Sequence, residues 1–308
     1  MTPGSRTGRG RCAFVLVMLL GCCFDTGHAQ DPMFTFTLLP AGDPESRPPR
    51  AASINLSGAI VGNHLDVERS HGVYMEGCCA GEYATIQHPK GVHTQTTGIN
   101  DHGSIVGYYG NKLSGPAIEH GYLLENGEFT TIDYPGALST RIAGINNAGE
   151  IVGYAKSPHA GFLYKDGEFI EIVCPAGGRT YPLAINNKHE IVGRCVPDHL
   201  FLWSGGEISI LDFDAPVSHA SIAPRGINDR GDIVGSYYAD DEATGRPKSI
   251  GFILTGARTN PVFRTLYPGS GTVITGINND GKIVGYMATG SFLATEMGTG
   301  SGFPVSHP

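Results

Sequence analysis

Short hydrophobic segments alternate with turns rich in glycine and asparagine along most of this chain, and the alternation repeats. A ten-residue phrase similar to GINNAGEIVG occurs six times. The six copies begin at Ser53, Gly98, Gly144, Ala184, Gly226 and Gly276. The asparagine at the third position of the phrase recurs after 45, 46, 40, 42 and 50 residues. A period of this length is typical of the blades of a β-propeller and exceeds one coil of a β-solenoid.

Each repeat contains four strand-like segments, which are clearest over residues 139–172. Their sequences in chain order are TRIAGIN, EIVGYA, AGFLYK and FIEI, each short and rich in branched or aromatic side chains, as β-strands are. Because the same order recurs six times, the sequence predicts an all-β fold: a six-bladed β-propeller with four-stranded blades. A ring of repeats forms one unit, so we expect a single domain over residues 30–297.

The two ends of this domain are expected to meet in one blade. The segment FTFTLLP at residues 34–40 has the pattern of a fourth strand but precedes every repeat, whereas the last repeat ends after its third strand at 291–295. The simplest closure places the N-terminal strand on the outside of the last blade, which leaves no open edge in the ring. Residues 298–308 are expected to form a flexible tail.

The repeated phrase itself is interpreted as structural. In its N-x-x-G turn the asparagine carboxamide bonds to the backbone and the glycine adopts positive φ, a position that His189 occupies in the fourth copy. The glycine of each IVG segment and the small residue before each Ile-Asn pair indicate close backbone approach near the axis. The alternative is a ring of carboxamides that binds a ligand. We favour turn formation, because six turns at six blade edges are not expected to converge on one point.

The first 29 residues have the features of a signal peptide. Arginines precede an apolar run over residues 12–24, and small residues follow at 27–29. The run is shorter than the roughly 20 apolar residues of a transmembrane helix. Its LLGC sequence, which ends at Cys22, resembles a bacterial lipobox in which Cys22 would carry a lipid; in plain secretion Cys22 is only part of the run. Either way we expect a secreted or cell-envelope protein, with membrane contact only if Cys22 is lipidated.

The charge balance argues against nucleic acid as a partner. The chain has 21 Lys and Arg residues against 29 Asp and Glu, a formal net charge of −8 at pH 7. Without the first 29 residues the counts are 18 and 28, a net charge of −10. Such a surface repels polyphosphates, and no basic run with interleaved aromatic residues offsets it.

The repeats resemble a known family at this level of detail. The six phrases are followed in four repeats by a histidine and, one to three residues later, an aromatic or other apolar residue, mostly after small residues; these histidines are His71, His120, His159 and His199. This combination resembles the HAF family of extracellular repeat proteins, over about residues 34–297. The resemblance implies an exported repeat protein and brings no established catalytic residues. The fifth and sixth repeats depart from it, with Ile250 and Gly290 near the histidine position.

The candidate site is a face of the propeller rather than a motif. Loops from second to third strands and from fourth to next first strands must share one face, and these are the long loops, where binding residues concentrate. The candidates on this face are His64, Asp66, Glu68, Arg69, Arg179, Tyr181, Asp240, Asp241, Glu242 and Arg246. The acidic run at 240–242 offers oxygen ligands for a hard cation, but it lacks D-x-D-x-D-G spacing, so a solvated acidic loop is the favoured interpretation.

Neither a metal nor a cofactor is expected. Imidazole suits zinc, but one histidine in each of four blades is spread around a wide ring, and ligands about 2 Å from one ion cannot be assembled in that way. The cysteines beyond the leader are Cys78, Cys79, Cys174 and Cys195. The first two and the last two are expected on opposite faces, so a bridge between these pairs is excluded, whereas a Cys174–Cys195 disulfide is compatible with the strand order.

These features favour a binding or interaction module over an enzyme. No G-x-S-x-G motif and no S-x-D-x-G-x-T-W turn of the sialidase type occurs. Six-bladed propellers also include lactonases, lyases and quinoprotein dehydrogenases, so the fold does not decide between binding and catalysis. We expect a monomer that binds an unidentified protein or glycan; the alternative is a hydrolase or lyase on the long-loop face. Clustered carboxylates at the axial mouth would favour the enzyme, and exposed aromatic residues without such a cluster would favour binding.

Overall fold

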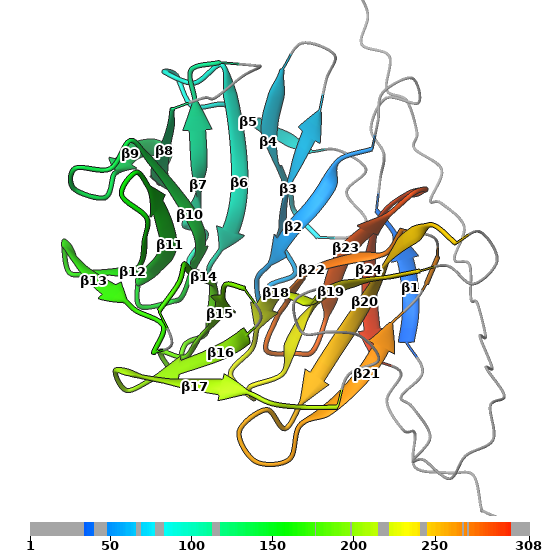
Figure 1. The fold of residues 1–308 in the computed structure, drawn as a ribbon. Coiled ribbons are helices and arrows are strands. Elements are labelled where there is room, and N and C mark those ends of the chain that lie inside the picture. Colours follow the sequence, from blue (N-terminus) through cyan, green and yellow to red (C-terminus); the bar gives the residue numbers. More distant parts are fainter. Residues whose placement is uncertain are drawn as a thin grey trace, which may run out of the picture.

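The structure is a computed structural model that describes residues 34–39, 48–65, 69–77, 83–112, 118–175, 177–197, 199–214, 222–240, 245–266, 268–269 and 271–296. Within these residues the chain forms 24 β-strands, arranged as six four-stranded sheets around a common centre (Figure 1). The predicted six-bladed β-propeller is confirmed. In the described part of the chain, no helix has the length and apolar character needed to cross a membrane.

Five blades follow the chain from the innermost to the outermost strand, and the sixth combines both ends. The first blade consists of β2 (Arg50–Ile54), β3 (Ile60–Leu65), β4 (Ser70–Met75) and β5 (Ala84–Ile86). The second consists of β6 (His93–Ile99), β7 (Ile105–Gly110), β8 (Glu119–Glu125) and β9 (Glu128–Ile132). The third consists of β10 (Ser139–Ile145), β11 (Ile151–Lys156), β12 (Ala160–Lys165) and β13 (Glu168–Ile172).

The remaining blades repeat this order. The fourth consists of β14 (Thr180–Ile185), β15 (Ile191–Cys195), β16 (His199–Ser204) and β17 (Glu207–Leu211). The fifth consists of β18 (Ile222–Ile227), β19 (Ile233–Asp240), β20 (Pro247–Thr255) and β21 (Val262–Leu266). The sixth consists of β22 (Val273–Ile277), β23 (Ile283–Met287), β24 (Gly290–Glu296) and β1 (Phe34–Leu38).

The N-terminal strand closes the ring, as the sequence predicts. β1 pairs antiparallel with β24, from Phe34 opposite Glu296 to Leu38 opposite Phe292, and the two strands lie side by side in Figure 1 despite their opposite places in the sequence. The Phe36 ring meets the Phe292 ring edge-on, with 5.7 Å between centroids. β1 therefore supplies both the backbone pairing and an aromatic contact for the last blade.

The repeat glycines make room for packing. A side chain at Gly226 would lie 3.2 Å from the Cα of Gly276 in the next blade, so the small residue before each Ile-Asn pair does permit neighbouring first strands to approach. The glycine of the IVG segment acts inside its own blade: a Cβ at Gly153 would collide with the Arg141 carbonyl and with the Phe162 ring. Phe162 is fully buried, so this glycine admits the third-strand aromatic residue to the core.

A β-bulge interrupts every first strand. The pairing of β10 with β11 skips from Ile142 to Gly144, and the other five first strands shift register at the same place. The residues left unpaired are Ala52, Thr97, Ala143, Leu183, Arg225 and Thr275. Because a bulge re-aims side chains, these six residues acquire a direction that the strand alternation alone would not give them.

The turns after the first strands have the predicted geometry. The glycine of the turn has positive φ, for example +77° at Gly149, and His189 adopts +62° in its place. The Asn146 side-chain oxygen accepts hydrogen bonds from the backbone nitrogens of Ala148 (3.1 Å) and Glu150 (3.0 Å). The left-handed conformation costs His189 about 1 kcal/mol relative to glycine.

A disulfide connects the third and fourth blades. Cys174, just after β13, is joined to Cys195 at the end of β15, with 5.8 Å between their Cα atoms. The bond closes a separation of 21 residues. Cys78 and Cys79 lie outside the described residues, as do the expected signal peptide with Cys22 and the expected tail at 298–308.

Closure by β1 is tested by Phe36→Ala. We expect the free energy of unfolding to fall by about 2 kcal/mol, because the half-buried ring loses its contact with Phe292. Leu38→Ala is the control in the same strand, since its side chain is 45% exposed, and should cost less than about 1 kcal/mol. Deletion of residues 34–39 should also promote self-association through the open edge of β24. Urea unfolding and size-exclusion chromatography measure both; a fully stable, monomeric deletion variant would contradict closure.

Candidate functional site

A cavity of about 550 Å³ lies on the propeller axis at the face that carries the long loops. Its walls come from the beginnings of the first strands and the ends of the second strands, so it lies where the six blades converge. This volume is in the range of about 300–1,000 Å³ that is usual for small-molecule sites.

Three positions of the repeat supply these walls: all three do so in the first four blades, and two of the three in the fifth and sixth, where Ser236 and Val273 do not line the cavity. One is the residue five before the repeat asparagine, and another is the residue that follows the IVG segment. These two are paired across the strands in the first four blades as Arg50–Asn63, Gln95–Tyr108, Arg141–Tyr154 and Tyr181–Arg194. The third is the bulge residue, and all six bulge residues line the cavity. Cross-strand partners lie on one face of a sheet, and the bulge re-aims the third residue, so the side chains at these positions reach the same cavity.

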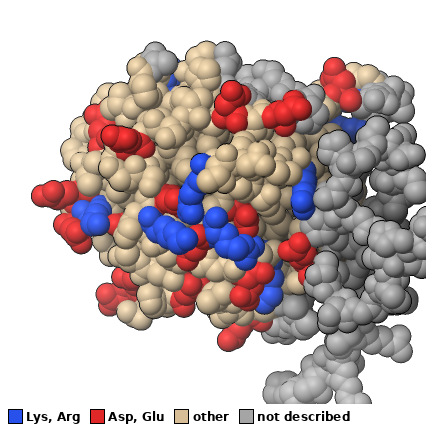
Figure 2. Space-filling model, turned by 90° about the horizontal axis from the view of Figure 1, so that it is seen from below, with Lys and Arg blue, Asp and Glu red and all other residues tan. Residues whose placement is uncertain are grey.

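The described residues that line the cavity include basic side chains and no acidic ones. The arginines are Arg50, Arg141, Arg194 and Arg225. The tyrosines are Tyr108, Tyr154, Tyr181 and Tyr286. The face seen in Figure 2 differs, since both acidic and basic side chains occur there. In a protein of net charge −8, the cavity is therefore a local concentration of positive charge.

Arg141 is held in place by a buried carboxylate. Its Nε donates to Oε2 of Glu119 at 2.6 Å, a second guanidinium nitrogen donates to Oε1, and Lys156 Nζ lies 3.1 Å from the same carboxylate. Burial raises the pKa of Glu119, but the bonds from Arg141 and Lys156 outweigh it and leave the pKa below its ordinary value. One negative charge thus faces two positive charges, and this group retains a net positive charge.

Aromatic rings support the arginines. The Arg141 guanidinium lies 4.8 Å from the centroid of the Tyr108 ring, and that of Arg50 lies 5.0 Å from the Tyr286 centroid. These cation–π contacts are favourable by about 0.5–2 kcal/mol each. Arg50 and Arg225 are exposed to the cavity and form no ion pair with any described residue. Their charges are therefore available to a ligand.

A second axial feature lies at the turns of the repeated phrase. Each repeat asparagine donates from Nδ2 to the backbone carbonyl of the equivalent asparagine in the next blade, at 2.9–3.4 Å. The circle runs through Asn55, Asn100, Asn146, Asn186, Asn228 and Asn278 and back to Asn55. The expectation that these turns do not converge was wrong, because the first strands form the innermost ring.

The circle of asparagines is nonetheless structural. The cavity it surrounds has a volume of only about 90 Å³. Each side-chain oxygen serves its own turn and each nitrogen serves the next blade, so both ends of the carboxamide are already bonded. The turn interpretation therefore stands for a different reason from the one that the sequence supplied.

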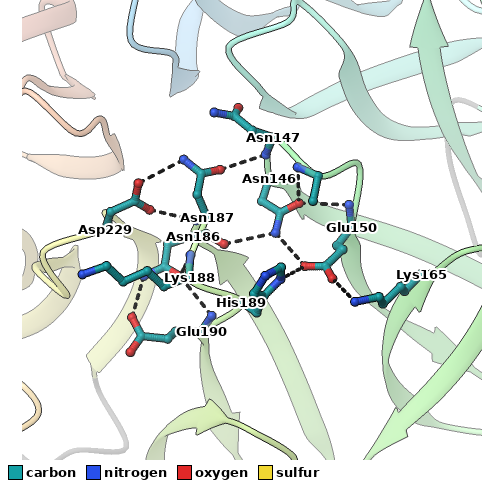
Figure 3. A network of polar contacts seen from close by, with 11 residues as sticks. Asn146, Asn147, Glu150, Lys165, Asn186, Asn187, Lys188, His189, Glu190 and Asp229 are labelled. Atoms are coloured by element: carbon teal, nitrogen blue, oxygen red, sulfur yellow. Dashed lines mark hydrogen bonds and ion pairs between the residues drawn. The ribbon is translucent and has the colours of Figure 1, made fainter.

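Charged groups reinforce this circle between the third and fourth blades (Figure 3). The Asn146 nitrogen also donates to Glu150 Oε2 at 2.7 Å. Lys165 Nζ lies 2.8 Å from Oε1 of Glu150, and His189 Nδ1 lies 2.5 Å from Oε2. The left-handed turn at His189 thus places its ring against the carboxylate of the preceding blade, which links the two blades.

The structure brings one of the sequence candidates into the cavity. Tyr181 lines it, whereas Arg69, Arg179, Asp240 and Arg246 are exposed elsewhere. His64, expected at the exposed loop face, is instead 4% exposed and packs beside His71 in its blade. The candidates outside the described residues are Asp66, Glu68, Asp241 and Glu242.

Two of the repeat histidines are hydrogen-bonded to other groups of the protein. His120 Nδ1 lies 2.7 Å from Asp133 Oδ2, and His159 Nε2 lies 3.1 Å from the Thr180 carbonyl oxygen. Among the described residues, no group of three His, Cys, Asp or Glu side chains is arranged to hold a metal ion.

The cavity residues had a signal in the sequence, which lies in the second strands and not in the loops. The repeats agree at IVG and then differ at the next residue, which reads Asn63, Tyr108, Tyr154, Arg194, Ser236 and Tyr286. Five of these six residues line the cavity, whereas Ser236 is buried. A position that varies mainly among large polar residues inside an otherwise uniform strand is the pattern expected of side chains that face a ligand rather than the core.

Comparisons with known proteins support the fold. No protein-family model matches the chain, and no curated protein matches it. Among solved structures, TolB from Acinetobacter baumannii is 11% identical with a TM-score of 0.52, covering 72% of this chain and 55% of its own. A catalytically inactive virginiamycin B lyase from Staphylococcus aureus, solved with quinupristin, is 11% identical with a TM-score of 0.52, covering 86% of this chain and 100% of its own. This chain thus spans about half of the TolB chain, and similarity at such identity shows the fold alone.

The circle of asparagines is tested by Asn146→Ala. The substitution removes two turn bonds, one of the bonds to the Asn186 carbonyl and one of the bonds to Glu150. Because these four bonds are largely buried, we expect the protein to lose about 3 kcal/mol of stability. Asn147→Ala is the matched control, because its side-chain bonds to Asp101 are exposed to water; it should cost less than about 1 kcal/mol. Equal losses in urea unfolding would show that the circle contributes nothing beyond an ordinary turn.

Glu150 should make stability depend on pH. Burial raises the pKa of its carboxyl, but the bonds from Lys165, His189 and Asn146 outweigh burial and hold the pKa below the ordinary value of 4.5. A lowered folded-state pKa stabilises the fold above the ordinary pKa, and this contribution disappears as the pH falls through the folded-state value. Glu150→Gln should therefore lose less stability than the wild type between pH 6 and about pH 3. Glu168→Gln, at an exposed position, should follow the wild type in urea unfolding at both pH values; identical curves for all three proteins would contradict this role.

Proposed function

We propose that this protein is an exported binding module whose ligand, a protein segment or a glycan, occupies the axial cavity of the long-loop face. The observation that carries this proposal is the lining of the cavity by four arginines and four tyrosines, with no described carboxylate. Arginine and tyrosine are the side chains that most often dominate binding energy at recognition sites.

Export is supported from two directions. The first 29 residues have a charged segment, an apolar run and small residues in the order of a signal peptide. The Cys174–Cys195 disulfide is of a kind that forms and persists in oxidising compartments such as the periplasm or the extracellular space. A secreted or envelope location accounts for both, and a lipid on Cys22 would add membrane attachment.

Binding is favoured over catalysis by the chemistry of the walls. A hydrolase or lyase needs a group that exchanges a proton near the working pH, most often His, Asp or Glu. The described lining residues include none of these. Arginine stays protonated, and burial raises the pKa of Tyr108 further above its ordinary range, so Tyr108 is a poor base. An enzyme would have to take its carboxylates from loop residues such as Asp240.

The location of the site is tested by filling the cavity. Ala143, a bulge residue on the wall, is replaced by Trp, and ligands from a glycan and peptide panel are detected by saturation-transfer NMR. We expect the ligands of the wild type to lose most of their signal with Ala143→Trp at an unchanged melting temperature. Glu128→Trp, an exposed position on β9, should behave as the wild type.

Two results would contradict the proposal that the ligand binds in the cavity without being converted. If Asp240→Ala abolishes binding and Ala143→Trp does not, the ligand lies on the long loops. Conversion of a panel ligand to product by the wild type, detected as new NMR signals, would support the hydrolase or lyase.

A further inference from the structure

We propose that the ligand of the axial cavity is an acidic saccharide, whose ring carboxylate is bound by Arg50 and Arg225. This inference rests on the proposed function and names the ligand class of that site.

The charges of the cavity select an anion. Arg50 and Arg225 face it without an ion-pair partner among the described residues. Arg141 is joined to Glu119 and Lys156, a group that keeps one net positive charge. A cationic ligand would be repelled, and a neutral ligand would leave the guanidinium charges unused. Guanidinium groups bind carboxylates through two parallel hydrogen bonds, which gives orientation as well as affinity.

The neutral polar side chains of the walls are already bonded within the fold. The Asn63 carboxamide exchanges two hydrogen bonds with the Thr96 backbone, at 2.9 and 2.7 Å. Thr97 donates to the Ile142 carbonyl of the next blade at 3.0 Å, and Thr275 donates to the Ala51 carbonyl at 3.0 Å. The groups left to meet a ligand are chiefly guanidinium and phenol donors. Such a site fits a ligand rich in acceptor oxygens.

The remaining lining favours an organic ring over a small inorganic ion. Leu183, Val196 and Pro224 share the walls with the tyrosines, and about 550 Å³ exceeds the volume of a phosphate or sulfate several times. Tyr154 and Tyr181 meet edge to face, with 4.9 Å between centroids, and form a rigid aromatic corner. A sugar ring presents C–H groups to such aromatic surfaces and oxygens to the arginines, whereas an extended acidic peptide has no rigid ring for the corner.

The class is tested with tri-galacturonate as the probe. In titration calorimetry at low salt, we expect tri-galacturonate to bind the wild type, and free galacturonate to bind more weakly if the natural source is a glycan chain. Equal affinity per carboxylate for the two compounds would identify the free sugar acid, rather than a glycan chain, as the natural ligand. The uncharged methyl ester should bind at least tenfold more weakly, and 0.5 M NaCl should also weaken binding, because charge attraction is screened.

Variants assign the carboxylate to the two arginines. Arg225→Gln should weaken tri-galacturonate binding about tenfold, and Arg50→Gln with Arg225→Gln should weaken it further, at unchanged melting temperatures. Lys112→Gln removes the same charge from an exposed position near the end of β7 on the same face and should change affinity less than twofold. Equal effects of Lys112→Gln and Arg225→Gln would show only general charge attraction and overturn the proposal.

Other outcomes separate the inference from the proposed function. If neutral tri-galactose, inorganic phosphate or a tri-aspartate peptide binds as tightly as tri-galacturonate, or if no acidic saccharide binds, the ligand class is wrong. The cavity remains the site in each case provided that Ala143→Trp abolishes binding of a panel ligand. If that substitution affects no ligand, both the inference and the proposed function fail.

Discussion

The circle of hydrogen bonds around the axis is the constraint on which the rest of the propeller depends. Each repeat asparagine closes its own turn with its side-chain oxygen and bonds the next blade with its nitrogen. Asn278 completes the circle by donating to the Asn55 carbonyl at 2.9 Å. Both bonds form together only when six first strands stand side by side at close distance. The geometry of one local turn is thereby coupled to the number of blades, and the small residues such as Gly226 permit the approach that the bonds require.

Ring closure also converts local variation into a common site. The backbone conformation requires the asparagines and glycines of the turns and strands. The bulge residue and the residue after IVG are not constrained in this way and differ between blades. Arg50 and Arg225 are 175 residues apart in the sequence, yet both face the same cavity. A scaffold of repeated bonds therefore carries a set of side chains in which no two blades are alike.

Gathering positive charge in one cavity has a cost, because like charges repel and burial removes water from them. Glu119 offsets this cost for Arg141, and the rings of Tyr108 and Tyr286 offset part of it at Arg141 and Arg50. Local conflicts of this kind concentrate at functional sites. The charged side chains on the face seen in Figure 2 need no such arrangement, because water solvates them.

The sequence by itself determined the features that depend on neighbouring residues: six blades, four strands in each, the turn chemistry and the fourth-strand pattern of β1. The number of blades follows from the number of repeats, and the strands and turns follow from local backbone preference within each repeat. Only the tertiary structure decided which side chains meet. The bulge turns Ala143 and Arg225 towards the axis, the blade buries His64, and the asparagine turns converge although each looks isolated in the chain. Contacts between residues 40 or more positions apart depend on the closed ring, because interactions within one repeat do not determine the position of the next blade.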